Sequence, residues 1–188
     1  MRDGVKFHDR LYARFLLPLV PASVLPNHLT MFRMIFTPAV VVLAVMQWYI
    51  WSLIVFLILA FSDTLDGSLA RVRGQVTTWG KVFDPVADKI LVGSLVIVLV
   101  MQHLGPGLAL LILGLELTFL LIGWWKIKQG KEVQANRWGK IKMFLQVVGV
   151  SLLLLGLITG FQGLFQFSSQ TLYLALVFAL VSLLAAGF

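Results

Sequence analysis

Six long apolar runs constrain the fold of this chain more than any other feature. They cover residues 29–47, 50–70, 80–102, 108–127, 137–160 and 171–188. Each run is near the ~20 residues that an α-helix needs to cross the hydrocarbon core of a bilayer. Only 12% of the residues are charged, whereas soluble domains average about 25%. The sequence therefore predicts an all-α, polytopic membrane protein with six transmembrane helices, the first of them capped by Asn27 or Thr30.

Residues 1–20, which precede the first run, mix basic and apolar side chains. The basic residues recur at every fourth position, at Lys6, Arg10 and Arg14. This spacing predicts a short amphipathic helix lying in the membrane interface, with a disordered basic tail as the alternative. Prolines follow and would end such a helix. We therefore expect an N-terminal juxtamembrane segment, 1–20, followed by a single membrane domain, 21–188.

The basic residues fall on one side of the membrane in this topology. They lie in the N-terminal segment, around the turn between the second and third runs, and around the turn between the fourth and fifth. The positive-inside rule makes that side cytoplasmic, so we expect a protein of the cell (inner) membrane. The net charge of +7 is then explained by an anionic membrane surface rather than by nucleic acid. The absence of cysteine excludes disulfides and thiolate metal sites.

Four aspartates lie near the cytoplasmic ends of the second and third runs. Asp63 and Asp66 are three residues apart, and Asp84 and Asp88 are four apart, so each pair shares one helix face. Charged groups at membrane depth are costly and usually functional. If the two faces meet, the carboxylates need cations, and their hard oxygens favour two Mg²⁺ or Mn²⁺ ions. This pattern predicts metal-dependent phosphoryl transfer, with one carboxylate of unspecified identity as the base.

Small residues share the faces that carry these aspartates. Gly67, Ala70 and Gly80 either leave room for a flat ligand, such as a nucleotide, or simply let two helices pack closely. We favour the ligand, because the small residues lie among the candidate metal ligands. Arg71 can bind a phosphate through two hydrogen bonds, although it also suits a positive flank of the membrane.

These positions together resemble the signature of the CDP-alcohol phosphatidyltransferases. The pattern in this chain reads Asp63-x2-Asp66-Gly67-x2-Ala70-Arg71-x8-Gly80-x3-Asp84-x3-Asp88. The resemblance implies that the four aspartates hold two metal ions that bridge the pyrophosphate of a CDP-linked lipid, CDP-diacylglycerol. It also implies that Asp88 is the general base, that the small residues border the cytidine, and that Arg71 meets a phosphate. An alcohol would attack the β-phosphorus and CMP would leave, in an enzyme that is a homodimer.

The choice of alcohol depends on other parts of the chain. Residues 26–33 and 84–89 resemble the phosphatidylglycerophosphate synthase branch, whose acceptor is glycerol 3-phosphate. One departure is that Leu115 precedes Glu116 where this branch usually has an Arg-Glu pair. The candidate acceptor-binding residues are Arg33, Glu116, Arg137, Lys140 and Lys142.

Lys140 and Lys142 are not both expected to bind the acceptor. A helix turns by ~200° between them, so their side chains point in different directions and only one of them can face a given site. Each basic residue of this group also suits a cytoplasmic flank. Glu116, an acid inside an apolar run, is expected in the protein interior rather than against lipid.

Three alternatives remain open at the level of sequence. The same chemistry would serve inositol phosphate, or phosphatidylglycerol with cardiolipin as the product. A cation transporter would use the aspartates as an ion pathway, but it needs carboxylates spread through the membrane, and these lie at one end. A catalytically silent family member is disfavoured by the intact set of aspartates.

Overall fold

The computed structural model describes residues 21, 24–75, 77–129 and 137–185. Within these ranges the chain is helical without strands, and six helices are long and apolar enough to cross a membrane. The prediction of an all-α, polytopic protein with six transmembrane helices is therefore confirmed. The amphipathic helix predicted for residues 1–20 lies outside the described residues.

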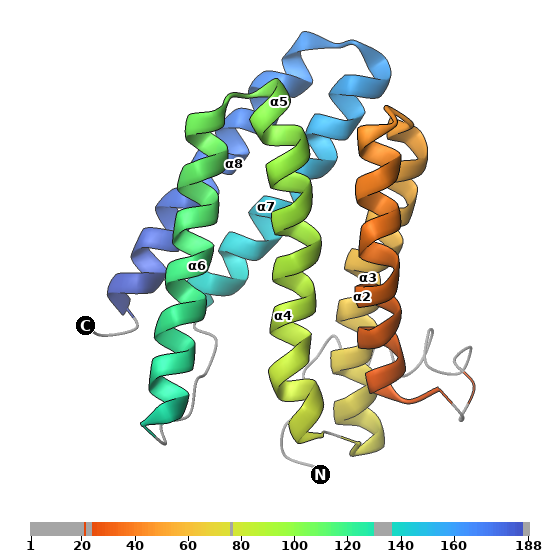
Figure 1. Ribbon diagram of the computed structural model, residues 1–188, viewed down its shortest axis with the longest axis vertical. Coiled ribbons are helices and arrows are strands. Elements are labelled where there is room, and N and C mark those ends of the chain that lie inside the picture. The colour runs from red at the N-terminus through yellow and green to blue at the C-terminus, as the bar shows by residue number, and fades with distance from the viewer. Residues whose placement is uncertain (1–20, 22–23, 76, 130–136, 186–188) are drawn as a thin grey trace. The chain divides into compact units, whose positions relative to one another are not determined.

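In the described part of the chain, six main helices and one short helix follow each other (Figure 1). They are α2 (Pro26–Val45), α3 (Tyr49–Arg73), α4 (Thr78–Leu95), α5 (Met101–His103), α6 (Pro106–Lys128), α7 (Arg137–Thr159) and α8 (Gln162–Ala185). A π-helical turn, Val96–Val100, joins α4 to α5, so the third span continues to His103. Helix α2 begins at Pro26, a position where proline is favoured because a backbone N–H would have no partner there.

The last helix begins nine residues earlier than the predicted start at residue 171, and residues 162–170 are helical rather than a loop. Gly160, with φ of 69°, ends the preceding helix, and α8 starts two residues later. The Ser168 hydroxyl donates a hydrogen bond of 2.7 Å to the Gly149 carbonyl oxygen of α7. The polar composition of residues 162–170 had suggested a loop. One of these polar residues, Ser168, instead makes a buried contact between α8 and α7.

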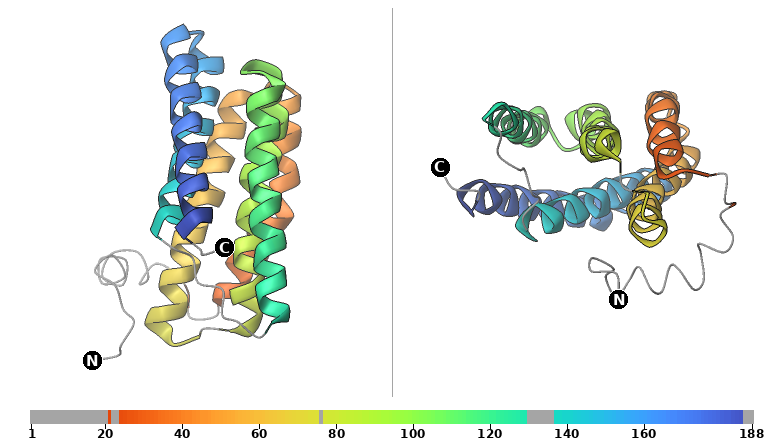
Figure 2. Two further views of the ribbon diagram at one scale, coloured as in Figure 1. Left: turned by 90° about the vertical axis from the view of Figure 1, so that its left-hand side faces the viewer. Right: turned by 90° about the horizontal axis from the view of Figure 1, so that it is seen from below.

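The described residues divide into two compact units. The first contains residues up to 40 and residues 54–91, where α2 and α4 begin and α3 ends. The second contains residues 41–53 and everything from 92 onward, including α6, α7 and α8. In the second unit, α7 and α8 form an antiparallel pair joined by a short turn (Figure 2).

Large apolar side chains are exposed on several helices. Leu121, Phe144 and Leu184, for example, are 65%, 67% and 76% exposed. Contiguous apolar surface is unfavourable in water but suits helices that face lipid. This surface agrees with a multi-pass membrane protein.

Candidate active site

The four aspartates belong to the first unit, with Asp63 and Asp66 on α3 and Asp84 and Asp88 on α4. Three of them meet at the guanidinium of Arg33, which α2 supplies. Arg33 Nη1 donates to Asp63 Oδ1 at 2.8 Å and to Asp88 Oδ1 at 2.5 Å. Its Nη2 donates to Asp66 Oδ2. Carboxylates from both helices are thus gathered at one point, which meets the condition that the two aspartate faces lie together.

The fourth carboxylate, that of Asp84, is held by another residue of α2. The Thr30 hydroxyl donates a hydrogen bond of 2.6 Å to Asp84 Oδ1. Asp84 lies two residues before the apolar span that begins at Val86. Burial raises the pKa of Asp84 above its ordinary value, while the hydrogen bond from Thr30 and the charge of Arg33 act in the opposite direction. One helix therefore supplies a partner for every aspartate of the motif.

Most of the cluster is buried, although the side chain of Asp63 is 36% exposed, and the cluster has an excess of negative charge. Arg33 is 0% exposed, and the side chains of Asp66 and Asp88 are 3% and 13% exposed. Four carboxylates and one guanidinium leave three formal negative charges if all are ionised. Because buried charges are stable only when they are compensated, this cluster calls for further positive charge or for protons.

The donor set suits a hard divalent cation, since all of its atoms are carboxylate oxygens. Among the described residues, however, no three acidic or histidine side chains are arranged to hold a metal ion. The Arg33 guanidinium lies where three of the carboxylates converge. The chemistry and charge of the aspartates are therefore compatible with Mg²⁺ or Mn²⁺, and the presence of such ions stays a prediction.

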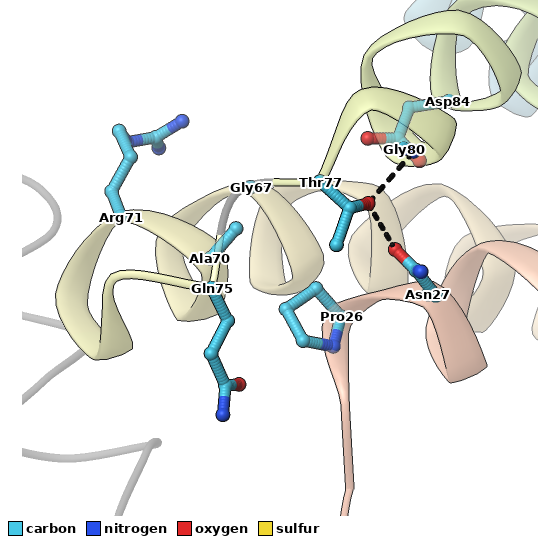
Figure 3. Close-up of a pocket in the computed structure, with 9 residues that line it drawn as sticks. All are labelled: Pro26, Asn27, Gly67, Ala70, Arg71, Gln75, Thr77, Gly80 and Asp84. Atoms are coloured by element: carbon cyan, nitrogen blue, oxygen red, sulfur yellow. Dashed lines mark hydrogen bonds between the residues drawn. The ribbon is translucent and has the colours of Figure 1, made fainter.

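An open pocket adjoins the aspartate cluster (Figure 3). Its lining consists of Pro26, Asn27, Gly67, Ala70, Arg71, Gln75, Thr77, Gly80 and Asp84. The structure thus brings together all four residues that the sequence had suggested for the CDP-linked lipid, and it adds one of the aspartates. The role of these residues in binding stays a prediction.

Hydrogen bonds hold one wall of this pocket (Figure 3). The Thr77 hydroxyl donates to Asn27 Oδ1 at 2.9 Å, and it accepts from the Gly80 backbone N–H at 2.9 Å. A Cβ atom at Gly80 would lie 3.1 Å from Thr77 Oγ1 and 3.4 Å from Asp84 Oδ2. Glycine here therefore lets the start of α4 approach both the pocket wall and the aspartate.

Sequence reasoning did not assign Asn27, Gln75 or Thr77 to a site, although the structure places them on the pocket wall. Gln75 Oε1 is buried without a hydrogen-bond partner among the described residues. For Gln75 and Thr77 the available signal was position, because both lie in the turn between α3 and α4, which carry the motif, whereas Asn27 belongs to the start of α2.

A second polar cluster lies in the second unit and joins α6 to α7. Glu116 Oε1 accepts hydrogen bonds from Lys142 Nζ at 2.5 Å and from Gln146 Nε2 at 2.9 Å. Glu116 is 9% and Lys142 4% exposed, and Glu116 Oε2 is buried with no partner in the described chain. Glu116 therefore lies in the interior, as expected for an acid in an apolar run, and Gln146 is a partner that the sequence had not suggested.

The other basic candidates of α7 have a different environment. Arg137 and Lys140 are exposed, whereas Lys142 is buried. This difference agrees with the expected rotation between Lys140 and Lys142. Only the latter joins the Glu116 cluster within the described residues.

Known proteins match this chain over most of its length. The family model for CDP-alcohol phosphatidyltransferases matches residues 23–183. The CDP-diacylglycerol–glycerol-3-phosphate 3-phosphatidyltransferase of Bacillus subtilis (strain 168) is 32% identical in an alignment of 174 residues, which covers 84% of this chain and 90% of the relative. Proteins of the same name from Rickettsia felis and Aquifex aeolicus are also 32% identical, over 70% and 71% of this chain and 75% of their own length. This chain belongs to the CDP-alcohol phosphatidyltransferase family and is a phosphatidyltransferase.

Proposed function

We propose that this enzyme transfers the phosphatidyl group of CDP-diacylglycerol to sn-glycerol 3-phosphate, giving phosphatidylglycerophosphate and CMP. One observation carries the first half of this proposal: Asp84 belongs both to the aspartate motif and to the wall of the adjoining pocket. A ligand in the pocket would therefore reach the carboxylates with one of its ends. The names of the relatives support the choice of acceptor.

The pocket suits the nucleotide end of the lipid. Gly67, Ala70 and Gly80 add little side-chain bulk to the lining, which would favour a flat ligand such as a cytidine. Arg71 lines the same pocket, and its guanidinium can bind a phosphate through two hydrogen bonds. The pyrophosphate would then lie toward Asp84.

Asp63, Asp66, Asp84 and Asp88 would hold two Mg²⁺ or Mn²⁺ ions. When bound, these ions would neutralise the pyrophosphate and stabilise the charge that develops on it. Support comes from the all-oxygen donor set and from the negative charge that Arg33 alone does not balance.

Asp88 would act as the general base, as the family resemblance implies. Its carboxylate would accept the proton of the attacking hydroxyl of the acceptor. A new oxygen–phosphorus bond would form at the β-phosphorus, while the bond from that phosphorus to the bridging oxygen would break. The electron pair would leave with CMP.

Among the basic residues of α7, Lys142 is our candidate for binding the phosphate of the acceptor. It is the buried basic residue of α7, and it pairs with Glu116, the acid that follows Leu115. A cation supplied by α7 would compensate for the arginine that the chain lacks at position 115. Glu116 Oε2 would accept a hydrogen bond from an acceptor hydroxyl, and Arg33, Arg137 and Lys140 remain further candidates.

The orientation in the membrane is also part of the proposal. The basic turns would face the cytoplasm by the positive-inside rule, which puts the aspartates at the cytoplasmic side of the cell (inner) membrane. A water-soluble acceptor would reach them there. We also propose a homodimer, on the family resemblance alone.

The proposal is tested with purified protein, CDP-diacylglycerol and a panel of radiolabelled acceptors, namely glycerol 3-phosphate, inositol phosphate and phosphatidylglycerol. We expect labelled phosphatidylglycerophosphate, formed with one CMP per lipid. EDTA should stop the reaction and Mg²⁺ or Mn²⁺ should restore it. Product from inositol phosphate or phosphatidylglycerol alone would disprove the acceptor, and undiminished activity in EDTA would disprove the metal dependence.

A further inference from the structure

Arg33 has an unusual position for a basic residue near the start of a membrane span. A residue one turn or two into such a helix can extend its side chain to the aqueous interface. Arg33 instead points inward and is 0% exposed. Both of its terminal nitrogens donate to aspartates of the catalytic motif.

The guanidinium contacts one oxygen of each of three carboxylates that would hold the proposed metal ions. Its partners come from both helices, with Asp63 and Asp66 on α3 and Asp88 on α4. Because the guanidinium fills the point where these three carboxylates converge, a divalent ion can take that point only if Arg33 moves away. Arginine and metal are therefore alternative partners for this part of the site.

Arg33 is an incomplete partner for the cluster. Its Nε is buried with no hydrogen-bond acceptor among the described residues, and a buried donor without a partner is destabilising. Its single positive charge also leaves an excess of negative charge. The hydrogen bond to Asp84 comes from Thr30. A residue that served only as a permanent structural partner would be expected to have all its donors satisfied.

We propose that Arg33 is the counter-ion of the aspartate site in the metal-free protein, and that it releases the carboxylates when divalent cations bind. Arg33 and the ions then compete for Asp63, Asp66 and Asp88. This inference rests on the metal site of the proposed function. In the metal-free protein Arg33 keeps the like charges of α3 and α4 together, so that the ligands are already gathered when an ion arrives.

Mn²⁺ binding to the purified full-length protein tests this competition, with free Mn²⁺ followed by electron paramagnetic resonance. Arg33→Gln removes the competing charge, and it should tighten Mn²⁺ binding by about tenfold or more, where tenfold corresponds to about 1.4 kcal/mol. Arg33→Lys keeps the charge without the two-pronged geometry, so its affinity should lie between those of Arg33→Gln and the unchanged protein.

Thermal unfolding gives a second measurement that does not depend on activity. In EDTA, Arg33→Gln should melt at a lower temperature than the unchanged protein, because the carboxylates lose their counter-ion. Saturating Mn²⁺ should close most of this gap. Arg73→Gln is the matched control: Arg73 donates to the backbone carbonyls of Pro21 and Val24, so the effect of its loss should be the same with and without metal.

The outcomes separate this inference from the proposed function. Equal or weaker Mn²⁺ binding by Arg33→Gln and Arg33→Lys would overturn the competition while leaving the metal site in place. Failure of Mn²⁺ to bind the unchanged protein and both variants would instead remove the metal site itself. If Arg33→Gln folds only with Mn²⁺ present, the counter-ion role is supported, and the affinity of Arg33→Lys decides whether the two cations compete.

Discussion

Asp88 is the residue whose replacement tests the proposed chemistry most directly. Asparagine has nearly the same shape but neither the negative charge nor the basicity of aspartate. Asp88→Asn should therefore reduce CMP release by about 10²–10⁴-fold, the usual contribution of a positioned base. Binding of CDP-diacylglycerol should persist in part, since the pocket residues are unchanged. Undiminished turnover of this variant, measured under single-turnover conditions, would remove Asp88 as the base.

Lys142 and Glu116 form a buried ion pair in which each partner depends on the other. Lys142→Met leaves the Glu116 carboxylate buried without its cation, which should lower the free energy of unfolding by about 3–5 kcal/mol. Adding Glu116→Gln should recover part of that loss, because no charge is then left unpaired. Denaturation of the two single variants and the double variant measures the coupling.

Lys140→Met is the control for this pair, since Lys140 is exposed on the same helix. It should change the free energy of unfolding by no more than about 0.5 kcal/mol. Equal destabilisation by Lys140→Met and Lys142→Met would contradict the assigned pair. A raised KM for glycerol 3-phosphate in Lys142→Met alone would further support its role in acceptor binding.

At the scale of single residues, the sequence predicted which aspartates share a face but not what meets them. The spacing within α3 and α4 is sufficient to align Asp63 with Asp66 and Asp84 with Asp88. The partner, Arg33, comes from α2, more than thirty positions away from Asp66, and helical periodicity carries no information on such contacts. Asn27 and Thr30 were likewise predicted as helix caps. In the structure Asn27 accepts a hydrogen bond from Thr77, and Thr30 donates one to Asp84 of α4.

At the scale of helices, the close approach of α7 and α8 depends on a glycine. A Cβ atom built at Gly149 would lie 2.7 Å from both Cγ and Cδ2 of Leu172, so Gly149→Ala forces one helix to move. We expect the free energy of unfolding to fall by about 1–3 kcal/mol, as for other overpacked cores. The melting temperature of the purified protein measures this loss.

Gly114→Ala provides the contrast, because a Cβ atom at Gly114 would have no neighbour within 4 Å. Alanine should stabilise α6 there by about 0.5–1 kcal/mol through the lower entropy of the unfolded chain. Equal effects of the two substitutions would show that contact with Leu172 is not what makes Gly149 sensitive.

The limits of helices were predictable where apolar runs ended in charge or proline, and not where they ended in uncharged polar residues. The start of α8 illustrates the second case. Gln162, Gln166 and Ser168 lower the hydropathy of this stretch, although Ser168 is buried against α7 and bonds to its backbone. A tertiary contact thus compensates a polar side chain that sequence hydropathy counts as a loop residue.

At the scale of the whole molecule, six spans and the placement of basic residues define a testable topology. The chain has no cysteine, so a single introduced thiol reports on one position without a background. Gln102→Cys would lie at the exposed end of the third span, and Gln129→Cys just after the fourth. Neither position is among the proposed site residues, so both variants should retain activity.

In intact cells, a membrane-impermeant maleimide should label Gln102→Cys but not Gln129→Cys, which should react only after the membrane is opened. This expectation follows from the basic residues near the fourth turn, Lys126 and Lys128, which should stay in the cytoplasm. The opposite pattern would place the basic turns outside the cell. Labelling of both positions in intact cells would contradict a membrane span between Gln102 and Gln129. The aspartates lie toward the end of α3 and the start of α4, on either side of the other basic turn. The expected labelling would put them on the cytoplasmic side, from which the proposed acceptor, glycerol 3-phosphate, would reach them.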